Sequence, residues 1–441
     1  MPFTRRQFIR TGVGAAFAAT PSAGVFSTLA NPPANPKPAV SIVKIRNDNI
    51  PAAVEKAIDL LGGISAVTQG KNRILLKPNL VIDNPNCTTK PQVIHMLARL
   101  MQRAGKEVSI GEGSGDVSSI TNGKATRCDD VLDRMQQWVF QRLGYTELAA
   151  SLGVPLINLH LGDLVTLPVP NGLFWQEIAL HRSLVETDLL CSVPMMKTHT
   201  YATVTLGLKN LIGLYPGSVY GSYRWWVHSN AYAKRSPGVA FEILDMAQVS
   251  RLGLTVIDGS TAMEGNGPAN GPLIQMNLII AGTHPLAADM VAASVMGFSP
   301  TEVPTFVWAQ KLGMQPSALA DIELRGETIA SVRRPFVRPS LTTPVTSSDL
   351  YPAPKLRTER GSDGKAALTW DEATPKAIIE YTAEGKAKVG WTNTLQGGQS
   401  ILEQNAQLGR PGWTRVIPAT PGRHEFDLKP NTQHFFRLRK P

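Results

Sequence analysis

The stretch RILLKPNLVIDNPNCTTKPQVIHMLARLMQRAGKEVSIGEGSG, residues 73–115, decides the fold of this chain. It contains two short aliphatic runs, RILL and EVSI, separated by the helical pattern KPQVIHMLARLMQRAG. A continuous apolar run of strand length indicates a strand buried on both faces, and parallel strands need a crossover such as a helix between them. The stretch therefore predicts a strand–helix–strand unit of a parallel sheet.

The same alternation continues on both sides of this unit. Further strand-like runs are AVSIVKI, DLLCSVPM, LTVIDGS and MNLIIAG, which begin at residues 39, 188, 254 and 276. Helical patterns follow some of them, as in IPAAVEKAIDLL from residue 50 and PLAADMVAASVMGF from residue 285. Residues 31–332 are thus predicted to form an α/β domain with a mostly parallel sheet and helices on both faces.

The pattern changes after residue 332. Residues 333–354 are rich in Pro, Ser and Thr, without helical or strand periodicity, and are predicted to be a linker. Residues 355–441 contain short alternating runs broken by Gly, Pro and Asn, which predicts a small all-β sandwich. Its ending FDLKPNTQHFFRL, residues 426–438, resembles the closing strands of a fibronectin type III domain, with His434 where that family has its corner tyrosine.

The N-terminus has the three parts of an export signal. Paired arginines in TRRQFIR, residues 4–10, precede a run rich in Gly and Ala, and Thr28-Leu29-Ala30 offers a small-residue cleavage site. This predicts a twin-arginine signal peptide over residues 1–30 and a periplasmic or extracellular location. A membrane anchor or a basic amphipathic start is the alternative. The apolar run is short for a bilayer, so no stable membrane anchor is expected after cleavage.

Charge and cysteine content narrow the function classes. The chain has 44 basic and 34 acidic residues, and the excess is spread along it without blocks that interleave with aromatics. We therefore expect no nucleic-acid partner, whereas an anionic small molecule or polysaccharide is compatible. The three cysteines, Cys87, Cys128 and Cys191, are isolated, so the chain cannot supply a standard iron–sulfur cluster.

Polar residues follow several of the predicted strands. In open parallel sheets, ligands bind at the carboxyl ends of the strands, so these residues are expected to meet at one edge. They are Lys77-Pro78-Asn79, the loop GEGSG at residues 111–115, Lys197-Thr198-His199, and Asp258-Gly259 followed by Glu264. Each of them alone has a plainer explanation, as a solvated lysine, a flexible turn or a structural histidine.

Three roles are open to these residues. The predicted catalytic residues are Lys197, His199, Lys209 and Glu264. The predicted ligand-binding residues are Lys77, Asn79, Asn210, Gly113 and Ser114. The candidate metal ligands are His199, Asp258, Glu264 and Asp289, which would suit a divalent cation. The cofactor stays unknown, because no HExxH or tight Asp/His cluster occurs, and no Gly-x-Ser-x-Gly elbow indicates a serine hydrolase.

The segment around Lys209 predicts how these groups are presented. Val204, Leu208, Leu211 and Ile212 have helical spacing, so a helix is expected to begin near Thr203, with Lys209 on its shoulder. The following stretch SVYGSYRWWVHSN, residues 218–230, is aromatic and irregular. It is interpreted as a lid over the site, a partner surface or a loop packed on the domain.

Four motifs together resemble one known family. LLKPN, MMKTHTYATVTLGLKNLIG, VIDGSTAMEGNGPANG and GTHPLAADMVAASVMGF occur in the order and spacing of the domain of unknown function catalogued as family 362, over about residues 39–326. The resemblance implies that the motif residues include Lys77, Lys197, Lys209 and Asp289. Many members carry a ferredoxin-like cluster domain, which implies redox work for those members; this chain departs from that pattern by lacking the cysteines, so an electron-transfer role is not expected here.

The sequence favours an exported enzyme with a cationic crevice that acts on an anionic substrate, because convergent polar groups in a crevice are the usual mark of a site. Whether the crevice contains a metal is left open. Two alternatives stay open: a protein that binds a ligand or metal without turnover, and an accessory protein for another exported enzyme. In the first alternative the C-terminal sandwich would hold a protein partner or a polysaccharide, and the aromatic residues around Tyr220, Tyr223, Trp225 and Trp226 are compatible with either alternative.

Overall fold

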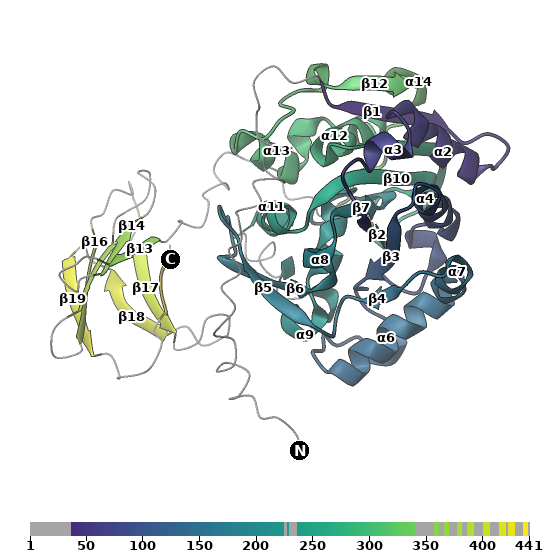
Figure 1. Ribbon diagram of the computed structural model, residues 1–441. Helices are drawn as coiled ribbons and strands as arrows, with labels where there is room; N and C mark the ends of the chain where they lie inside the picture. The colour runs from purple at the N-terminus through teal and green to yellow at the C-terminus, as the bar shows by residue number, and fades with distance from the viewer. Residues whose placement is uncertain are drawn as a thin grey trace. The chain divides into compact units, whose positions relative to one another are not determined.

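The computed structural model describes residues 37–224, 227–228 and 236–340 in full, and the strands between residues 357 and 439 by their backbone (Figure 1). The chain divides into two compact units, Met1–Leu350 and Tyr351–Pro441. The first unit holds all the side chains discussed below.

A central sheet organises the first unit. Its main path runs in the order β12-β1-β11-β10-β7-β2-β3-β4, and β8 pairs with β10 and with β9. Most of the pairs are parallel, and the antiparallel ones are β1 with β11, β10 with β11, and β8 with β9. The strands are β1 (Ala39–Lys44), β2 (Arg73–Pro78), β3 (Glu107–Glu112), β4 (Leu156–Asn158), β7 (Leu189–Val193), β8 (Met195–His199), β9 (Thr203–Thr205), β10 (Leu252–Met263), β11 (Leu273–Gly282) and β12 (Glu323–Gly326). The predicted mixed α/β domain with a mostly parallel sheet is confirmed.

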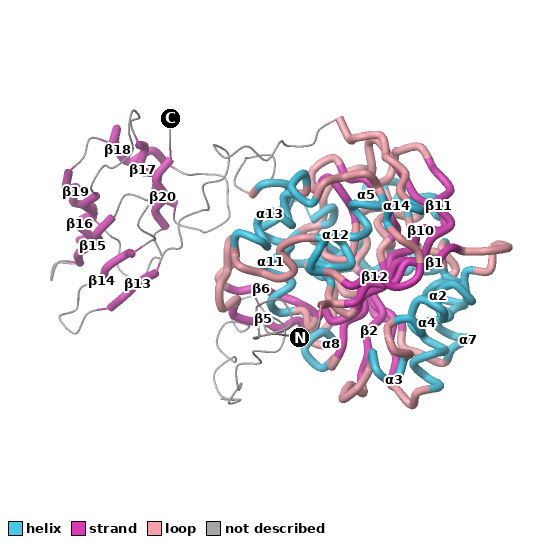
Figure 2. Tube along the Cα trace, turned by 90° about the horizontal axis from the view of Figure 1, so that it is seen from above, coloured by secondary structure: helices cyan, strands magenta, loops and turns pink. Residues whose placement is uncertain are grey.

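Helices cover both faces of this sheet, as Figure 2 shows. Alternate residues of a strand point to opposite faces, so Leu75 belongs to one apolar core while Ile74 and Leu76 belong to the other. The second core includes residues of α2 (Ile50–Leu60), α4 (Pro91–Arg103), α6 (Asp129–Arg142) and α7 (Tyr145–Leu152). The first includes residues of α8 (Ser183–Glu186), α11 (Ala240–Val249), α12 (Pro285–Val295) and α13 (Pro304–Lys311).

The helix starts follow from local sequence. The side chain of Asn49 accepts a hydrogen bond from the backbone N–H of Ala52 at 3.0 Å, which caps α2. Proline stands in the first turn of α2, α4, α12 and α13, where its missing N–H would have no partner anyway. The short helices are α3 (Ile64–Val67), α5 (Ser118–Thr121), α9 (Gly217–Tyr220) and α14 (Ile329–Val332), and a separate hairpin pairs β5 (Leu164–Pro168) with β6 (Glu177–His181).

The helix expected to begin near Thr203 is not formed. Residues Thr203–Thr205 are strand β9, antiparallel to β8, and a 3-10 helix, η2 (Lys209–Leu214), follows. β-branched residues at 203–205 favour a strand, and the apolar spacing that suggested a helix arises because both elements are buried. Lys209 therefore lies at the start of a tight turn.

Asp289 of α12 fixes the backbone just before this turn. Its two carboxylate oxygens accept hydrogen bonds from the N–H groups of Gly207 and Leu208, each at 2.8 Å. The carboxyl group is buried, and a Cβ at Gly207 would lie 2.9 Å from its Oδ1. The position of Lys209 thus depends on a carboxylate that lies 82 residues after Gly207 in the chain.

The first residues of the expected linker lie on the α/β unit. The N–H groups of Arg334 and Phe336 donate to the carbonyls of Val295 and Met296 at 2.9 Å, and Phe336 is buried. The carbonyl of Val337 accepts from the N–H of Gly265 at 2.9 Å. The Pro-rich composition here reflects an extended segment without its own helix or strand, held by the domain.

The C-terminal unit is described by its strands. β13 (Arg357–Arg360), β14 (Ala366–Thr369), β15 (Ala377–Tyr381), β16 (Lys386–Trp391) and β19 (Gly422–Asp427) form one antiparallel sheet. β17 (Ser400–Asn405), β18 (Thr414–Ala419) and β20 (Phe435–Arg439) form another. The packing of these sheets, and with it the sandwich, stays a prediction. Residues 1–30, with the predicted signal peptide, lie outside the described residues.

Within the described residues, none of the helices combines the length and the apolar character needed to cross a bilayer.

The role of Asp289 gives a testable prediction. In Asp289→Asn, one of the two N–H groups loses its acceptor in a buried site, which costs about 1–3 kcal/mol. We expect the free energy of unfolding of the full-length protein, measured by urea denaturation, to fall by this amount. Glu177→Gln, an exposed residue of β6, is the control and should change it by less than about 0.5 kcal/mol. An unchanged midpoint for Asp289→Asn would contradict the anchoring role.

Candidate functional site

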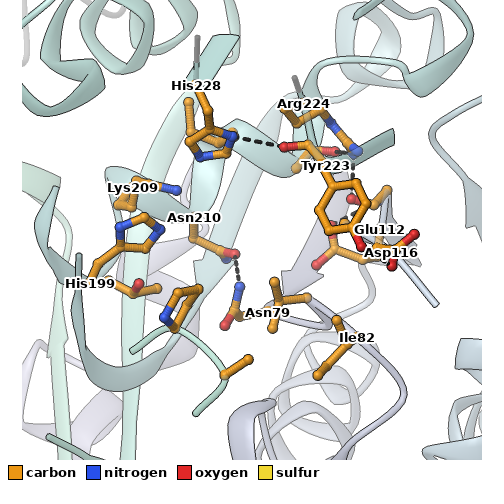
Figure 3. A pocket seen from close by; sticks show the side chains of 18 of the residues that line it. Asn79, Ile82, Glu112, Asp116, His199, Lys209, Asn210, Tyr223, Arg224 and His228 are labelled. Atoms are coloured by element: carbon orange, nitrogen blue, oxygen red, sulfur yellow. Dashed lines mark hydrogen bonds between the residues drawn. The ribbon is translucent and has the colours of Figure 1, made fainter. Parts of the chain in front are cut away.

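A cavity of about 700 Å³ opens at the carboxyl ends of β2, β3 and β8 (Figure 3). Seven of the predicted site residues line it: Lys77, Asn79, Gly113, Lys197, His199, Lys209 and Asn210. Val81, Ile82, Pro268 and Ala269 add apolar surface to the same cavity. The parallel strands thus bring the expected polar groups to one edge of the sheet.

A buried ion pair forms one wall of the cavity. The ammonium of Lys77 lies 2.7 Å from Oε1 of Glu112, and the two side chains are 1% and 2% exposed. Lys77 also donates to the carbonyl of Pro78 and to Oδ1 of Asn210, both at 3.1 Å. The other carboxylate oxygen of Glu112 accepts from the N–H of Leu80 at 2.8 Å. Burial lowers the pKa of Lys77, against the opposing effect of Glu112.

Glycine is required where η2 closes over this pair. A Cβ at Gly213 would lie 2.4 Å from Oε1 of Glu112 and 2.6 Å from the ammonium of Lys77. A Cβ at Gly113 would lie 2.6 Å from the carbonyl oxygen of Gly213. Gly213 therefore allows the backbone of η2 to approach the ion pair, and Gly113 allows that backbone to approach the end of β3.

Asn210 connects η2 to the strands. Its amide nitrogen donates to the carbonyl of Lys77 and to the hydroxyl of Ser192, both at 3.1 Å. Its Oδ1 also accepts from the amide nitrogen of Asn79 at 3.2 Å (Figure 3). The Oδ1 of Asn79 is buried without a hydrogen-bond partner in the described structure, so it offers a free acceptor to a ligand.

Lys124 also lines the cavity and is exposed, whereas Lys197 and Lys209 lie deeper and have no carboxylate partner among the described residues. The ammonium of Lys197 donates to the carbonyl of Cys87. The ammonium of Lys209 has no hydrogen-bond partner within the described part of the chain. Burial lowers the pKa of Lys197 to about 8. Burial, together with the charges of Lys197 and Lys77, lowers the pKa of Lys209 to about 7.

Two histidines stand beside Lys209 with opposite tautomers. Nδ1 of His199 accepts from the N–H groups of Tyr201 and Ala202 at 3.1 and 3.3 Å, so its proton is on Nε2. Nδ1 of His228 lies 2.8 Å from the carbonyl of Tyr223 and must donate to it, which leaves Nε2 with a lone pair. The rings stack with centroids 6.1 Å apart.

Both histidines are neutral in this environment. Burial and the charge of Lys209 lower the pKa of His228 to about 3. The same two causes hold the pKa of His199 well below its ordinary range. Figure 3 shows the Lys209 side chain alongside the two rings. One ring therefore presents a hydrogen-bond donor and the other an acceptor.

Tyr223 and Arg224 complete the cavity and were not among the residues predicted from sequence. Arg224 is buried and donates to the carbonyls of Ser114 and Gly113. The hydroxyl of Tyr223 donates to Asp116. Both backbone φ angles are positive, +58° and +52°. The only sequence signal was a basic residue inside an aromatic stretch, within the segment interpreted as a lid or partner surface.

The GEGSG loop does not present free N–H groups to the cavity. Gly113 N–H donates to Glu112 and Ser114 N–H to Gln136, at 2.8 and 2.7 Å. The N–H groups of residues 115 and 116 donate to the carbonyl of Val81. Gly113 lines the cavity, whereas Ser114 faces Arg224 and Gln136 from outside it. The loop shapes the wall without cradling an anion.

The candidate metal ligands do not come together. Asp258 is buried within β10, not in the expected loop, and accepts from the N–H of Lys90 at 2.8 Å. Glu264 accepts from the N–H of Val337, outside the cavity, at 2.8 Å. Asp289 holds the backbone before η2. Among the described residues, no group of three or more His, Cys, Asp or Glu side chains could hold a metal ion.

The ion pair generates a prediction about stability. Lys77→Met or Glu112→Gln leaves one buried charge without its partner, so each should lower the free energy of unfolding by about 3–5 kcal/mol, measured by urea denaturation. In the double variant neither charge is left alone, and its loss should be smaller than the sum of the single losses by at least about 1 kcal/mol. Strictly additive losses would contradict a direct interaction.

The chain is similar to a curated protein, to a solved structure and to a family model. Thylakoid-associated protein sll1697 of Synechocystis sp. is 27% identical over 270 residues, which cover 60% of this chain and 76% of that protein. The lactate racemase apoprotein from Thermoanaerobacterium thermosaccharolyticum aligns with a TM-score of 0.33 and 14% identity, over 58% of this chain and 57% of that one. The family model described as Domain of unknown function (DUF362) matches residues 74–294, half of the chain, and the chain belongs to this family.

Proposed function

We propose that this protein is an enzyme that binds an anionic substrate in the cavity and moves protons with Lys209 and the two neighbouring histidines. The observation that carries this proposal is the difference between Lys77 and two other lysines of the cavity. Lys77 is compensated by Glu112, whereas Lys197, which is buried, and Lys209, which is half-buried, have no carboxylate partner in the described structure.

Electrostatics favours an anion in this place. A unit charge 4 Å from a lysine ammonium contributes about 4 kcal/mol at an effective dielectric constant of about 20. Arg224 adds a further positive charge beside the cavity, because burial lowers its pKa only to about 10. The apolar surface of Val81 and Ile82 favours a substrate that has an organic part next to its anionic group.

Acid–base chemistry follows from the protonation states. A lysine whose pKa is about 7 is partly neutral at neutral pH, so it can take a proton as a general base. The Nε2–H of His199 can donate a hydrogen bond to a developing negative charge, and Nε2 of His228 can accept one. Glu264, predicted from sequence as catalytic, lies outside this arrangement and has no part in the proposal.

We also propose that the chain is exported by the twin-arginine route to the periplasm or the cell exterior, on the strength of residues 4–10 and 28–30. The name of the Synechocystis relative describes that protein as thylakoid-associated. For the C-terminal unit we propose a fibronectin type III-like sandwich that binds a protein partner or a polysaccharide, based on its antiparallel strands and its closing sequence.

Anion binding should depend on pH in a defined direction. Lys209 and Lys197 lose their charges as the pH rises through about 7 and about 8. Affinity for small anions, measured by calorimetric titration with phosphate, pyrophosphate and pyruvate, should therefore fall between about pH 6 and pH 9. Lys209→Met should weaken binding at pH 6 by about 10- to 100-fold, the loss of one charged contact.

Two comparisons make this test specific. Lys71→Met, at an exposed position, should leave the affinity unchanged. Affinity that does not vary with pH would contradict lysine-dependent binding. Conversion of a bound anion by the wild type and not by Lys209→Met, followed by mass spectrometry, supports an enzyme. If every anion that binds is recovered unchanged, the chain is a binding protein.

The export proposal has its own test. Replacing Arg5 and Arg6 together by Lys keeps the charge of the N-terminus but removes the paired arginines. We expect the variant to remain unprocessed in the cytoplasm of its host, while the wild type is cleaved near Ala30 and recovered from the periplasm or medium. Fractionation followed by N-terminal sequencing measures both. Equal export of the two proteins would contradict the twin-arginine route.

A further inference from the structure

Four lysines line the cavity: Lys77, Lys124, Lys197 and Lys209. Lys124 is exposed to solvent, and among the three that are not exposed only Lys209 has an amine without a partner in the described structure. The ammonium of Lys77 is held by Glu112, Pro78 and Asn210. The ammonium of Lys197 is held by a backbone carbonyl. The Lys209 ammonium has no partner among the described residues, and it lines a cavity large enough for an organic ligand. Lys77 and Lys197, whose ammonium groups have partners, place positive charge near Lys209.

The groups around Lys209 suit a carbonyl compound. Nε2–H of His199 can donate to a carbonyl oxygen, and Nε2 of His228 can accept from the neutral amine and so orient its lone pair. Lys197 keeps N–H groups beyond its bond to Cys87, and these can bind a carboxylate next to the carbonyl. A 2-oxo carboxylate has both features on adjacent carbons.

We infer that Lys209 acts as a nucleophile that forms an imine with the carbonyl carbon of a 2-oxo acid whose carboxylate is bound by Lys197. This inference rests on the proposed function, which it extends from anion binding to a covalent step. It adds a substrate class and a role for the free amine that general base catalysis does not require.

The step balances without an added reactant. The lone pair of the Lys209 nitrogen forms the N–C bond while the carbonyl π pair moves to oxygen. Both amine protons are transferred to that oxygen, which leaves as water, and the C=N bond remains. Nothing is oxidised or reduced. The imine nitrogen can then be protonated and withdraw electrons from the adjacent carbon, as lysine imines do with carbonyl substrates.

The environment favours the amine form required for this attack. Burial and neighbouring cations lower the pKa of Lys209 to about 7. An exposed lysine has a pKa of about 10.4 and is almost fully protonated at neutral pH. A lysine that is desolvated and placed next to other cations is a known way to activate an amine for imine formation.

The test is reductive trapping on the full-length protein. Wild type is incubated with pyruvate, glyoxylate or 2-oxoglutarate and sodium borohydride, which reduces an imine to a stable secondary amine. Intact-mass analysis counts the adducts, and peptide mapping finds the modified residue. We expect one adduct per chain with at least one of these acids, located on Lys209 and suppressed by excess phosphate.

The pH dependence separates Lys209 from surface lysines. At saturating 2-oxo acid, trapping should rise about tenfold between pH 6 and pH 8 and then level off, because the neutral fraction of a group with a pKa of about 7 saturates there. Trapping at an ordinary lysine would continue to rise above pH 8. A continued rise, or adducts on several lysines, would overturn the inference.

Two variants distinguish failure of this inference from failure of the proposed function. Lys209→Arg keeps a positive charge but has no nucleophilic amine, so it should bind pyruvate in a calorimetric titration and form no adduct. Lys197→Met should still be trapped on Lys209, at higher pyruvate concentration. If wild type binds the 2-oxo acids and forms no adduct, the inference fails and the proposed function stands. If it binds no anion at all, both fail.

Discussion

The buried ion pair between Lys77 and Glu112 is the interaction on which the cavity depends. The two residues stand near the carboxyl ends of neighbouring parallel strands, so the pair joins those strands at the edge of the sheet where η2 returns. An ion pair in such a place is unfavourable unless its remaining hydrogen-bonding capacity is satisfied. Carbonyls, Asn210 and backbone N–H groups satisfy it, and Gly213 supplies the space.

This arrangement also sets the electrostatics of the other two lysines. Glu112 is paired with Lys77 and with backbone donors. The charges that shift the pKa of Lys209 are those of Lys197, Lys77 and Arg224. The pKa of Lys209, lowered by burial and by the charges of Lys197 and Lys77, corresponds to a cost on the order of 5 kcal/mol for keeping it charged. Folding therefore places a group at this position that is close to losing its proton at neutral pH.

The sequence predicted the sheet and seven of the residues that line the cavity, because both follow from local patterns. Aliphatic runs mark buried strands, and the residues after parallel strands meet at one edge. It failed at residues 203–205, where burial of a strand and a 3-10 turn mimics a helical stripe. The sequence could not show that Asp258 and Asp289 accept hydrogen bonds from backbone N–H groups, or that Arg224 lines the cavity. Those contacts join residues far apart in the chain, which no local pattern records.

The lysines of the cavity differ in whether a carboxylate balances their charge: Lys77 is paired with Glu112, whereas Lys197 and Lys209 have no such partner among the described residues. Networks that only stabilise a fold can also shift pKa values, but they compensate their charges, as Lys77 and Glu112 do. Lys197 and Lys209 lack that compensation, and their desolvation opposes folding. An anion that enters the cavity would supply the missing countercharge, so the free energy lost on folding is regained on binding. Under the proposed function, the free amine at Lys209 therefore belongs to a site that is completed only when an anion binds.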